Sequence, residues 1–331
     1  MARRFVNTLS DGDQVEEVFF LADRQIRVNR NAAQYLVLEL RDRTGTIIAR
    51  MWNVSDENVA HIRAGEYGLV KGKVQLYQGA LQMIVTTVTP VGTDKVDPED
   101  FTRQSPRDLK ALEARLRELL QSIGNPPLRV LCDCFLKDQS LMTNFCTAPA
   151  GMKAHHAYVG GLLDHVVNML EIANRCVDLL GGVDRDLLLA GIFLHDLGKI
   201  RELSYDGPYG YTDEGQLLGH LVICLEILTA KIGEAEQVLG EPFPQETTLR
   251  LKHMVLSHHG TYEFGSPKLP MTPEAIALHQ IDNLDAKVHE FTREISEDPN
   301  GTSSFTPFNA RLDRKLFKGI RPPSAAASPG S

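Results

Sequence analysis

Hydrophobic residues follow two different spacings in this chain, and the change lies near residue 93. The first part alternates apolar and polar positions over short runs, which predicts β-strands. The expected strands are Val15–Val28, Tyr35–Leu40, Thr46–Trp52, Tyr67–Tyr77 and Leu81–Val88. Arg41–Gly45 predicts a hairpin turn with Gly45 in the left-handed conformation, and Gln78-Gly79 predicts a second turn. With a short polar helical insert at Asp56–Ile62, this pattern is typical of a small closed barrel of the OB type.

From Pro106 onward the apolar residues recur with helical spacing. Leu109, Leu112, Leu116, Leu119 and Leu120 would share one face of a helix. Further helices are expected at 127–137, 161–180, 185–194, 215–239, 247–256 and 273–295. We therefore predict an all-β barrel at 1–93, a polar linker at 94–106, an all-α bundle at 107–318 and a flexible tail at 319–331.

Composition narrows the class of protein. The 331 residues are 43% hydrophobic, which is enough for two cores, and no run of 18 apolar residues predicts a membrane span. Five cysteines form no disulfide framework and the first residues make a poor signal peptide, so we expect a cytoplasmic protein. The net charge of −8 argues against nonspecific coating of nucleic acid, although residues 1–93 carry +1.

A series of histidines and aspartates dominates the second part of the chain. Its members are His165, His195, Asp196, His220, His258, His259 and Asp282. Most lie in or at the end of predicted apolar helices, where burying such groups is costly unless a strong partner such as a metal ion binds them. His61, His253, His279 and His289 are interpreted as core residues without a role. The series therefore predicts a metal site.

Two ions fit this series better than one. His165, His195, Asp196 and Asp282 would hold the first ion, and Asp196, His220, His258 and His259 would hold the second. Asp196 would then bridge the two, and a bridging water would become the hydroxide nucleophile of a phosphodiesterase. A nitrogen and oxygen ligand set without thiolate suits manganese, iron, cobalt or zinc.

Other polar residues are candidates for contact with a substrate. Lys199 follows the His195-Asp196 pair and is predicted to hold a phosphate oxygen in catalysis, with an exposed lysine at a helix end as the alternative. Lys153 and His156 precede the paired glycines Gly160-Gly161 and are also predicted to bind substrate. A capping or turn role for that segment is the alternative.

The predicted barrel carries aromatic and basic residues that suit a single strand of nucleic acid. Such barrels stack bases on aromatic rings beside basic side chains. The alternative is that the aromatic residues are ordinary half-buried strand positions. The candidates are Arg41, Arg50, Trp52, Lys71, Lys73 and Tyr77.

Three motifs resemble the HD-domain metal-dependent phosphohydrolases, which are named for a His-Asp pair. They are 153–165, Phe193–Lys199 with its His195-Asp196 pair, and Tyr211–His220, followed by Leu256–Gly260 and 278–286. Together with the barrel, the chain over about 10–320 is similar to the YhaM family of 3′-to-5′ exoribonucleases. Asp164 stands where that family would have glutamate.

The resemblance implies removal of nucleoside 5′-monophosphates from the 3′ end of single-stranded RNA, with single-stranded DNA as a second substrate and manganese as the favoured metal. The lack of a long apolar run predicts no membrane partner, and the oligomeric state stays open, with an oligomer possible. An alternative enzyme would hydrolyse a small nucleotide or a cyclic dinucleotide, with the barrel as a regulatory module. A binding protein with a degenerate metal centre is a third hypothesis, and the complete ligand set argues against it.

Overall fold

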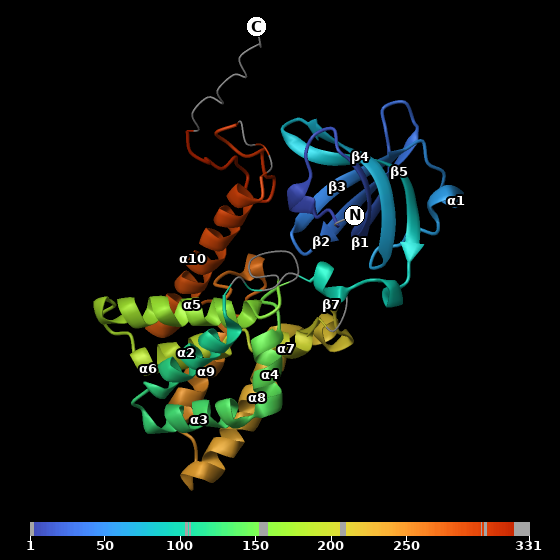
Figure 1. Cartoon of the computed structure of the whole chain (residues 1–331). Helices are drawn as coiled ribbons and strands as arrows, with labels where there is room; N and C mark the ends of the chain where they lie inside the picture. The colour runs from blue at the N-terminus through green and yellow to red at the C-terminus, as the bar shows by residue number, and fades with distance from the viewer. Residues whose placement is uncertain are drawn as a thin grey trace. The chain divides into compact units, whose positions relative to one another are not determined.

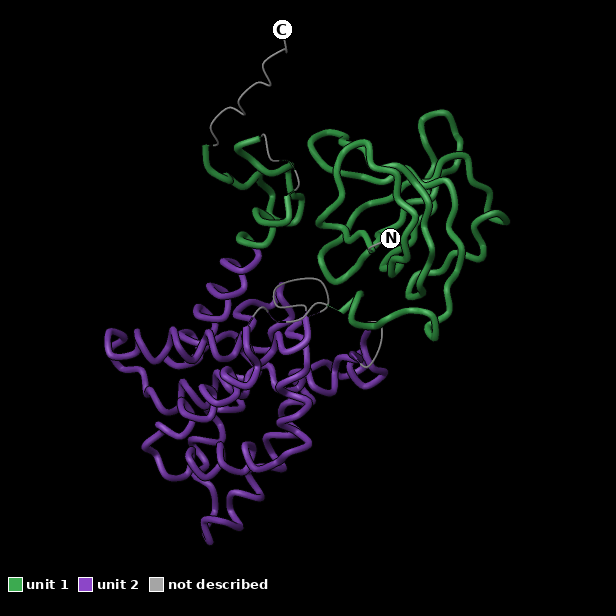
Figure 2. Tube along the Cα trace, in the orientation of Figure 1, with its two compact units in different colours: residues 1–103, 291–331 green, residues 104–290 purple. Residues whose placement is uncertain are grey.

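The computed structural model describes residues 3–102, 105, 107–151, 158–205, 210–298, 300 and 303–320. The chain forms two compact units, drawn in green and purple in Figure 2. Unit 1 comprises residues 1–103 and 291–331, and unit 2 comprises residues 104–290. Residues 291–318 thus group with the barrel, whereas the sequence analysis placed them with the helical bundle.

Five strands close into a barrel in unit 1, as predicted (Figure 1). The strands are β1 (Gln14–Val28), β2 (Gln34–Asp42), β3 (Gly45–Trp52), β4 (Tyr67–Tyr77) and β5 (Ala80–Val91). Their order is β1-β2-β3-β5-β4, with antiparallel pairing except between β3 and β5, which run parallel. The inward side chains form one apolar core that includes Phe19, Leu38, Val70 and Met83. Helix α1 (Asp56–Val59) is the predicted polar insert.

The two hairpin turns differ in how they are stabilised. Gln78 and Gly79 have φ angles of 50° and 84°, which is the backbone of a tight two-residue turn. At the other hairpin the prediction of a left-handed Gly45 is wrong, since Gly45 begins β3 opposite Asp42 and has no positive φ. The buried Asp42 carboxylate instead accepts N–H groups of Thr44 and Gly45, which closes the turn through a side chain.

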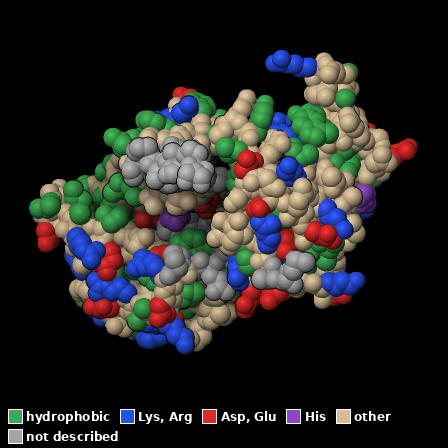
Figure 3. Space-filling view, turned by 45° about the horizontal axis from the view of Figure 1, so that its top comes forward, with side chains coloured by type: hydrophobic (Ala, Val, Ile, Leu, Met, Phe, Trp, Pro, Cys, Tyr) green, Lys and Arg blue, Asp and Glu red, His purple; other side chains and the backbone are tan. Residues whose placement is uncertain are grey.

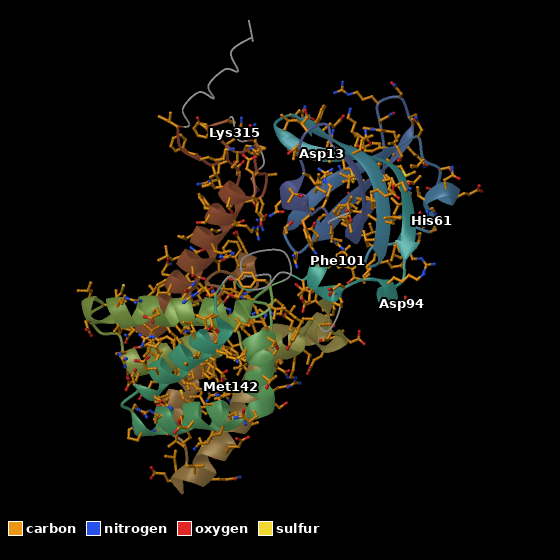
Figure 4. All side chains as sticks on the ribbon, in the orientation of Figure 1. Asp13, His61, Asp94, Phe101, Met142 and Lys315 are labelled. Carbon is orange, nitrogen blue, oxygen red and sulfur yellow. The ribbon has the colours of Figure 1, made fainter. Side chains whose placement is uncertain are left out.

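Unit 2 is a bundle of helices, in agreement with the predicted class. Two short helices, α4 and α7, and a two-stranded ribbon, β6 (Leu203–Ser204) with β7 (Gly210–Tyr211), were not predicted. Met142 of α4, labelled in Figure 4, is buried in this unit. The helices are α2 (Leu109–Gln121), α3 (Pro126–Lys137), α4 (Gln139–Thr147), α5 (Gly161–Cys176), α6 (Arg185–Leu194), α7 (Lys199–Glu202), α8 (Asp213–Leu239), α9 (Gln245–Ser257) and α10 (Pro273–Ser296).

Helix α6 is the centre of the bundle. Every residue from Leu187 to Leu194 is buried, and a helix that is apolar all round belongs inside a core. Phe193 packs edge-on against Phe135 of α3 and Phe145 of α4, with ring centroids 5.6 and 5.4 Å apart. The end of α6 is therefore fixed deep inside unit 2, and His195 follows immediately.

Helix α8 is the one described helix that is long and apolar enough to be considered as a membrane span. Its apolar window is 44% buried inside the protein, and Gly219 interrupts its helical backbone.

The described end of the chain is tied to the residues that follow α10. Lys318 forms a buried ion pair with Asp298 and donates to the carbonyl oxygen of Asn300. Phe305 and Phe317 pair across this segment, with ring centroids 5.2 Å apart. From residue 321 onward, the predicted tail lies outside the described residues.

Candidate metal centre

Five separate segments bring the predicted ligands together inside unit 2. His165 comes from α5, and His195 with Asp196 from the turn between α6 and α7. Potential ligand atoms of His165, His195 and Asp282 lie within 4.8 Å of one another, as do those of His220, His258 and His259. Apart from Asp196, these triads contain the residues of the two predicted ligand sets. A third group, His195, Asp196 and His258, meets the same criterion and takes one histidine from each predicted set.

Asp196 lies between the two triads and turns a different carboxylate oxygen to each. Its Oδ2 is 3.4 Å from His195 Nε2 and 3.9 Å from His165 Nε2. Its Oδ1 is 3.6 Å from Nε2 of both His220 and His258. Ligand atoms about 2.1 Å from a common ion are roughly 3.0–3.4 Å apart, so these separations are close to those of a coordination shell.

Helix ends fix the orientation of two histidines. His195 Nδ1 is 2.7 Å from the carbonyl oxygen of Ile192, and His258 Nδ1 is 2.8 Å from that of Val255. Carbonyl groups in the last turn of a helix lack a helical partner and can only accept, so each Nδ1 carries the proton. Each Nε2 is then a lone-pair donor that faces the centre.

Carboxylates orient two further histidines in the same way. Asp285 Oδ2 lies 2.7 Å from His165 Nδ1, and Glu202 Oε1 lies 3.1 Å from His220 Nδ1. Glu202 also accepts the backbone N–H of His220. A carboxylate behind the far ring nitrogen is a common support for a metal-binding histidine, because it fixes the ring and makes Nε2 more basic. Sequence reasoning did not identify Asp285 or Glu202.

Several buried atoms of the centre have no hydrogen-bond partner among the described residues. They are Nε2 of His195, Nε2 of His220, Nδ1 of His259 and Oδ1 of Asp196. Buried polar atoms without a partner are costly, and all four belong to groups that can donate a lone pair to a cation. The donor set therefore fits divalent metal ions.

Charge balance also favours cations here. Four carboxylates, those of Asp196, Glu202, Asp282 and Asp285, surround the histidines, and Lys199 is the ammonium group paired with them. With neutral histidines these groups sum to −3, an expensive charge to bury. One divalent ion would leave a net charge of −1, whereas two would bring the net charge to +1.

The pKa values follow from this crowding. Burial raises the pKa of Asp196, but the Lys199 ammonium group holds it well below its usual range. Burial lowers the pKa of His258 to about 3, so this ring is neutral, as a ligand must be. Burial also acts on His165, yet Asp282 and Asp285 outweigh it and raise its pKa to about 9. The His165 position therefore attracts a positive charge, whether a proton or a metal ion.

A close backbone contact places His220 in the centre. At Gly198, an added Cβ would lie 2.0 Å from the carbonyl oxygen of His220. Any other residue would push α8 away from the turn that carries Asp196. The glycine that ends the His-Asp motif is thus required by packing between two chain segments.

Lys199 lies at the predicted place beside the centre. Its Nζ donates to Asp196 Oδ2 and to the carbonyl oxygen of Ala150, at 2.6 Å in each case. Burial alone would lower the pKa of Lys199. The nearby Asp196 carboxylate has the larger effect and raises this pKa above its usual value, so the side chain stays charged. An ammonium group has three N–H donors, and these two contacts leave one for a phosphate oxygen. Lys153 and His156, the other predicted substrate contacts, lie outside the described residues.

One cavity of about 190 Å³ opens onto both ligand sets. It is reached by Asp196 and Lys199 and also by three residues that sequence reasoning left without a role, His279, Asn283 and Phe264. His279 Nδ1 donates to the carbonyl oxygen of His258 at 2.7 Å. By contrast, His253 Nε2 accepts the N–H of Met271, and His61 contacts the carbonyl oxygen of Val88. The interpretation of these two histidines as core residues is wrong, since His61 is exposed and His253 is only half-buried. No pattern in the sequence marked Phe264.

Asp164, the departure from the family pattern, is structural. It is buried in the first turn of α5 and accepts hydrogen bonds from Tyr158 and Arg107 at 2.8 and 2.7 Å.

The candidate nucleic-acid residues of the barrel differ in their exposure and in the contacts that their side chains make. Arg50 on β3 and Lys73 on β4 both pair in register with Ile84 of β5, so they share one outer face. Trp52 and Tyr77 are 45% and 52% exposed. Lys71 forms an ion pair with Glu16, whereas the Arg41 guanidinium lies 4.7 Å from the centre of the Phe20 ring and helps to cover it. Figure 3 shows acidic and basic side chains mixed over the face it draws.

The comparisons with known proteins agree with both units. The HD domain family matches residues 162–287, which implies dependence on a divalent metal, and the OB-fold nucleic acid binding domain family matches residues 21–91. These matches cover the bundle with its ligand sets and most of the barrel.

Relatives match nearly the whole chain. Three that are named 3′-5′ exoribonuclease YhaM come from Geobacillus sp. (strain WCH70), Bacillus velezensis and Bacillus subtilis (strain 168). They are 37%, 37% and 35% identical over 92%, 93% and 93% of this chain, and the matches cover 92%, 95% and 95% of the relatives. The chain belongs to the YhaM family of 3′-5′ exoribonucleases.

Proposed function

We propose that this protein is a metal-dependent exoribonuclease that removes nucleotides one at a time from the 3′ end of single-stranded RNA, with single-stranded DNA as a second substrate. The observation that carries the proposal is the position of Asp196, whose two oxygens face different histidine sets beside one cavity. A phosphodiester entering this cavity would meet both ligand sets at once. The products are nucleoside 5′-monophosphates.

The first ion would be held by His165, His195, Asp196 and Asp282, and the second by Asp196, His220, His258 and His259. We propose manganese as the native metal and expect iron, cobalt or zinc to bind the same nitrogen and oxygen donors. Two such ions, when bound, acidify a water and stabilise charge on the attacking and leaving oxygens of the phosphodiester.

The side chains around the ions prepare the site for this chemistry. The neighbouring Lys199 keeps the pKa of Asp196 low despite its burial, so its carboxylate is charged and can bridge. Lys199 is the proposed catalytic cation, with one N–H directed to a non-bridging phosphate oxygen. Lys153 and His156 are proposed to contact the next phosphate.

The barrel is the proposed grip on the single strand. Arg50 and Lys73 share one outer face, and Trp52 stacks against Tyr35 with ring centroids 4.8 Å apart while remaining partly exposed. We propose backbone contacts at Arg50, Lys71 and Lys73 and base stacking at Trp52 and Tyr77. Arg41, which covers Phe20, is the weakest candidate of the predicted set.

The five cysteines are free thiols, and burial raises the pKa of Cys132 and Cys224 to about 12 in each case. Free thiols without a disulfide framework agree with the proposed cytoplasmic location.

A pair of end-blocked substrates tests the proposal. A 5′-labelled oligoribonucleotide should be shortened stepwise in manganese, and a block at its 3′ end should stop the reaction, whereas a block at its 5′ end should not. Asp196→Ala is the inactive control. Hydrolysis of free or cyclic nucleotides without shortening of the oligomer would favour the small-nucleotide alternative.

A further inference from the structure

An exposed aromatic ring borders the cavity of the metal centre. Phe264 belongs to the short helical turn Tyr262–Phe264, which follows the His258-His259 pair. Its side chain lines the cavity together with Asp196 and His259, yet it remains 69% exposed. A phenylalanine of the hydrophobic core would be buried. Phe264 is exposed, so core packing does not account for its position.

The loop that carries Phe264 is held in place by its own hydrogen bonds. The N–H of Phe264 donates to the carbonyl oxygen of Thr261 at 3.2 Å, and that of Gly265 donates to Tyr262 at 3.0 Å. The N–H of Ser266 returns to Thr261 at 3.1 Å. Ser266 is buried, and its Oγ lies 3.1 Å from the carbonyl oxygen of Leu256 in α9. The ring is thus presented from an ordered turn.

The same loop is tied to the metal ligands. Gly260 has a φ of +80°, and a Cβ there would lie 2.0 Å from the His279 ring. Only glycine allows the chain to pass so close to that ring. A Cβ added to Gly265 would lie 4.0 Å from His259 Nδ1, a ligand atom of the second set. Phe264 thus lies between two glycines whose backbones pass close to His279 and His259.

We propose that Phe264 forms a subsite for the nucleobase of the 3′-terminal nucleotide and stacks on its face. The inference rests on the proposed exonuclease function and adds the element that holds the nucleotide to be removed. Every nucleobase has a π-face, so stacking on one ring accepts all four bases, as an enzyme that removes successive nucleotides requires. Asn283 and His279 of α10 line the same cavity and offer polar atoms for the sugar and phosphate.

A pair of substrates that differ in one base separates stacking from packing. One is a 5′-labelled oligoribonucleotide, and the other is the same oligomer with a 3′-terminal ribose that lacks its base. Phe264→Ala should lower kcat/KM for the first cleavage of the complete oligomer roughly 5- to 150-fold, the range expected for one lost stacking contact. On the oligomer without the base, the variant and the wild type should differ less than 2-fold.

Two further variants make the result specific. Phe264→Trp should restore most of the lost kcat/KM because indole also stacks. Tyr262→Ala changes a ring that is 66% exposed in the same turn but does not line the cavity, so it should behave like the wild type. Manganese content, measured for each variant, should be unchanged.

An equal loss on both oligomers would overturn the subsite and assign Phe264 to packing. Full activity of Phe264→Ala on the complete oligomer would overturn it too. If the wild type shortens neither oligomer, the proposed function fails, and this outcome is distinct from failure of the subsite.

Discussion

His165 and Asp285 lie 120 residues apart in the chain, and the Asp285 carboxylate holds the His165 ring through a 2.7 Å contact between Oδ2 and Nδ1. The contact joins α5 to α10 and directs His165 Nε2 toward Asp282 and Asp196. Glu202 supports His220 in the second set in the same manner. Each proposed ion thus has one histidine whose orientation depends on a distant carboxylate.

Removal of Asp285 should weaken metal binding without removing a ligand. We expect Asp285→Ala to lower manganese affinity about 10- to 100-fold, because the His165 ring loses its orientation and some basicity. Asp285→Asn should lose less, since its amide oxygen can still accept from Nδ1. Calorimetric titration of the metal-free protein with manganese measures both values. Lys287→Ala, a change on the same helix that leaves the centre intact, is the control. If Lys287→Ala lost as much manganese affinity as Asp285→Ala, the proposed role of Asp285 would be contradicted.

Asp196→Ala should abolish hydrolysis while strand binding remains. The substitution removes the group that both ligand sets share, whereas the proposed binding face of the barrel is unchanged. We expect at least a 1,000-fold loss of kcat, on the order of an essential catalytic group, and a change in Kd for a non-hydrolysable strand of less than about 3-fold. Asp178→Ala, at an exposed position, should retain wild-type activity. Retained activity in Asp196→Ala would exclude the proposed centre.

Arg50 and Lys73 should contribute to binding of long strands rather than to the chemical step. Each replaces a counterion on a phosphate, so the double variant Arg50→Ala/Lys73→Ala should bind a 20-nucleotide strand more weakly and with a smaller salt dependence, by about 1–2 in the slope of log K against log salt. Its turnover of a dinucleotide should match the wild type. Equal losses on the two substrates would show that this face is not the grip. Fluorescence anisotropy at several salt concentrations measures the slope.

Asp138 should stabilise unit 2 in a pH-dependent way. Its carboxylate accepts the N–H of Leu141 at the start of α4 and pairs with the buried Lys231 at 2.9 Å. These contacts lower its pKa, the Leu141 hydrogen bond most, so the unfolded chain binds the proton more readily than the folded one. The contribution is therefore present above about pH 4 and is lost as pH falls below it.

Two substitutions separate the cap from the charge. Asp138→Ala should lower the free energy of unfolding by about 1–2 kcal/mol at pH 7, and Asp138→Asn should lower it less because asparagine also caps helices. The difference in the free energy of unfolding between wild type and Asp138→Asn should shrink at pH 3.5. Urea unfolding of the protein in the presence of a metal chelator measures this difference. A difference that is constant with pH would show that the charge does not matter.

The sequence predicted the two fold classes and a set of candidate ligand residues that the structure brings together, because each leaves a local signal. Strand alternation, helical spacing and a His-Asp pair after an apolar helix can all be identified within a short window. Asp285 and Glu202 leave no such signal, since their role depends on which ring nitrogen of a distant histidine they meet. Phe264 was missed for a similar reason: only the structure shows that its ring is exposed and borders the cavity.

Helix α4 and the turn at Gly45 show where local rules fail. Helix α4 is short and contains Ser140, Thr143 and Asn144, which favour helices weakly, so tertiary packing of Leu141 and Phe145 stabilises it. At Gly45, the Asp42 side chain replaces the left-handed backbone that the glycine suggested. In α4 contacts with the rest of the bundle decide the conformation, whereas at Gly45 a local side-chain contact decides it.

The metal content of the purified protein tests the central claim most directly. After dialysis against manganese and removal of free metal, elemental analysis should find two ions per wild-type chain and also two in His253→Ala, whose histidine lies outside the ligand sets. His259→Ala should retain one ion, and Asp196→Ala should lose both to below about 0.5 per chain. One ion or none in the wild type, or two ions in Asp196→Ala, would contradict a centre in which Asp196 bridges two metals.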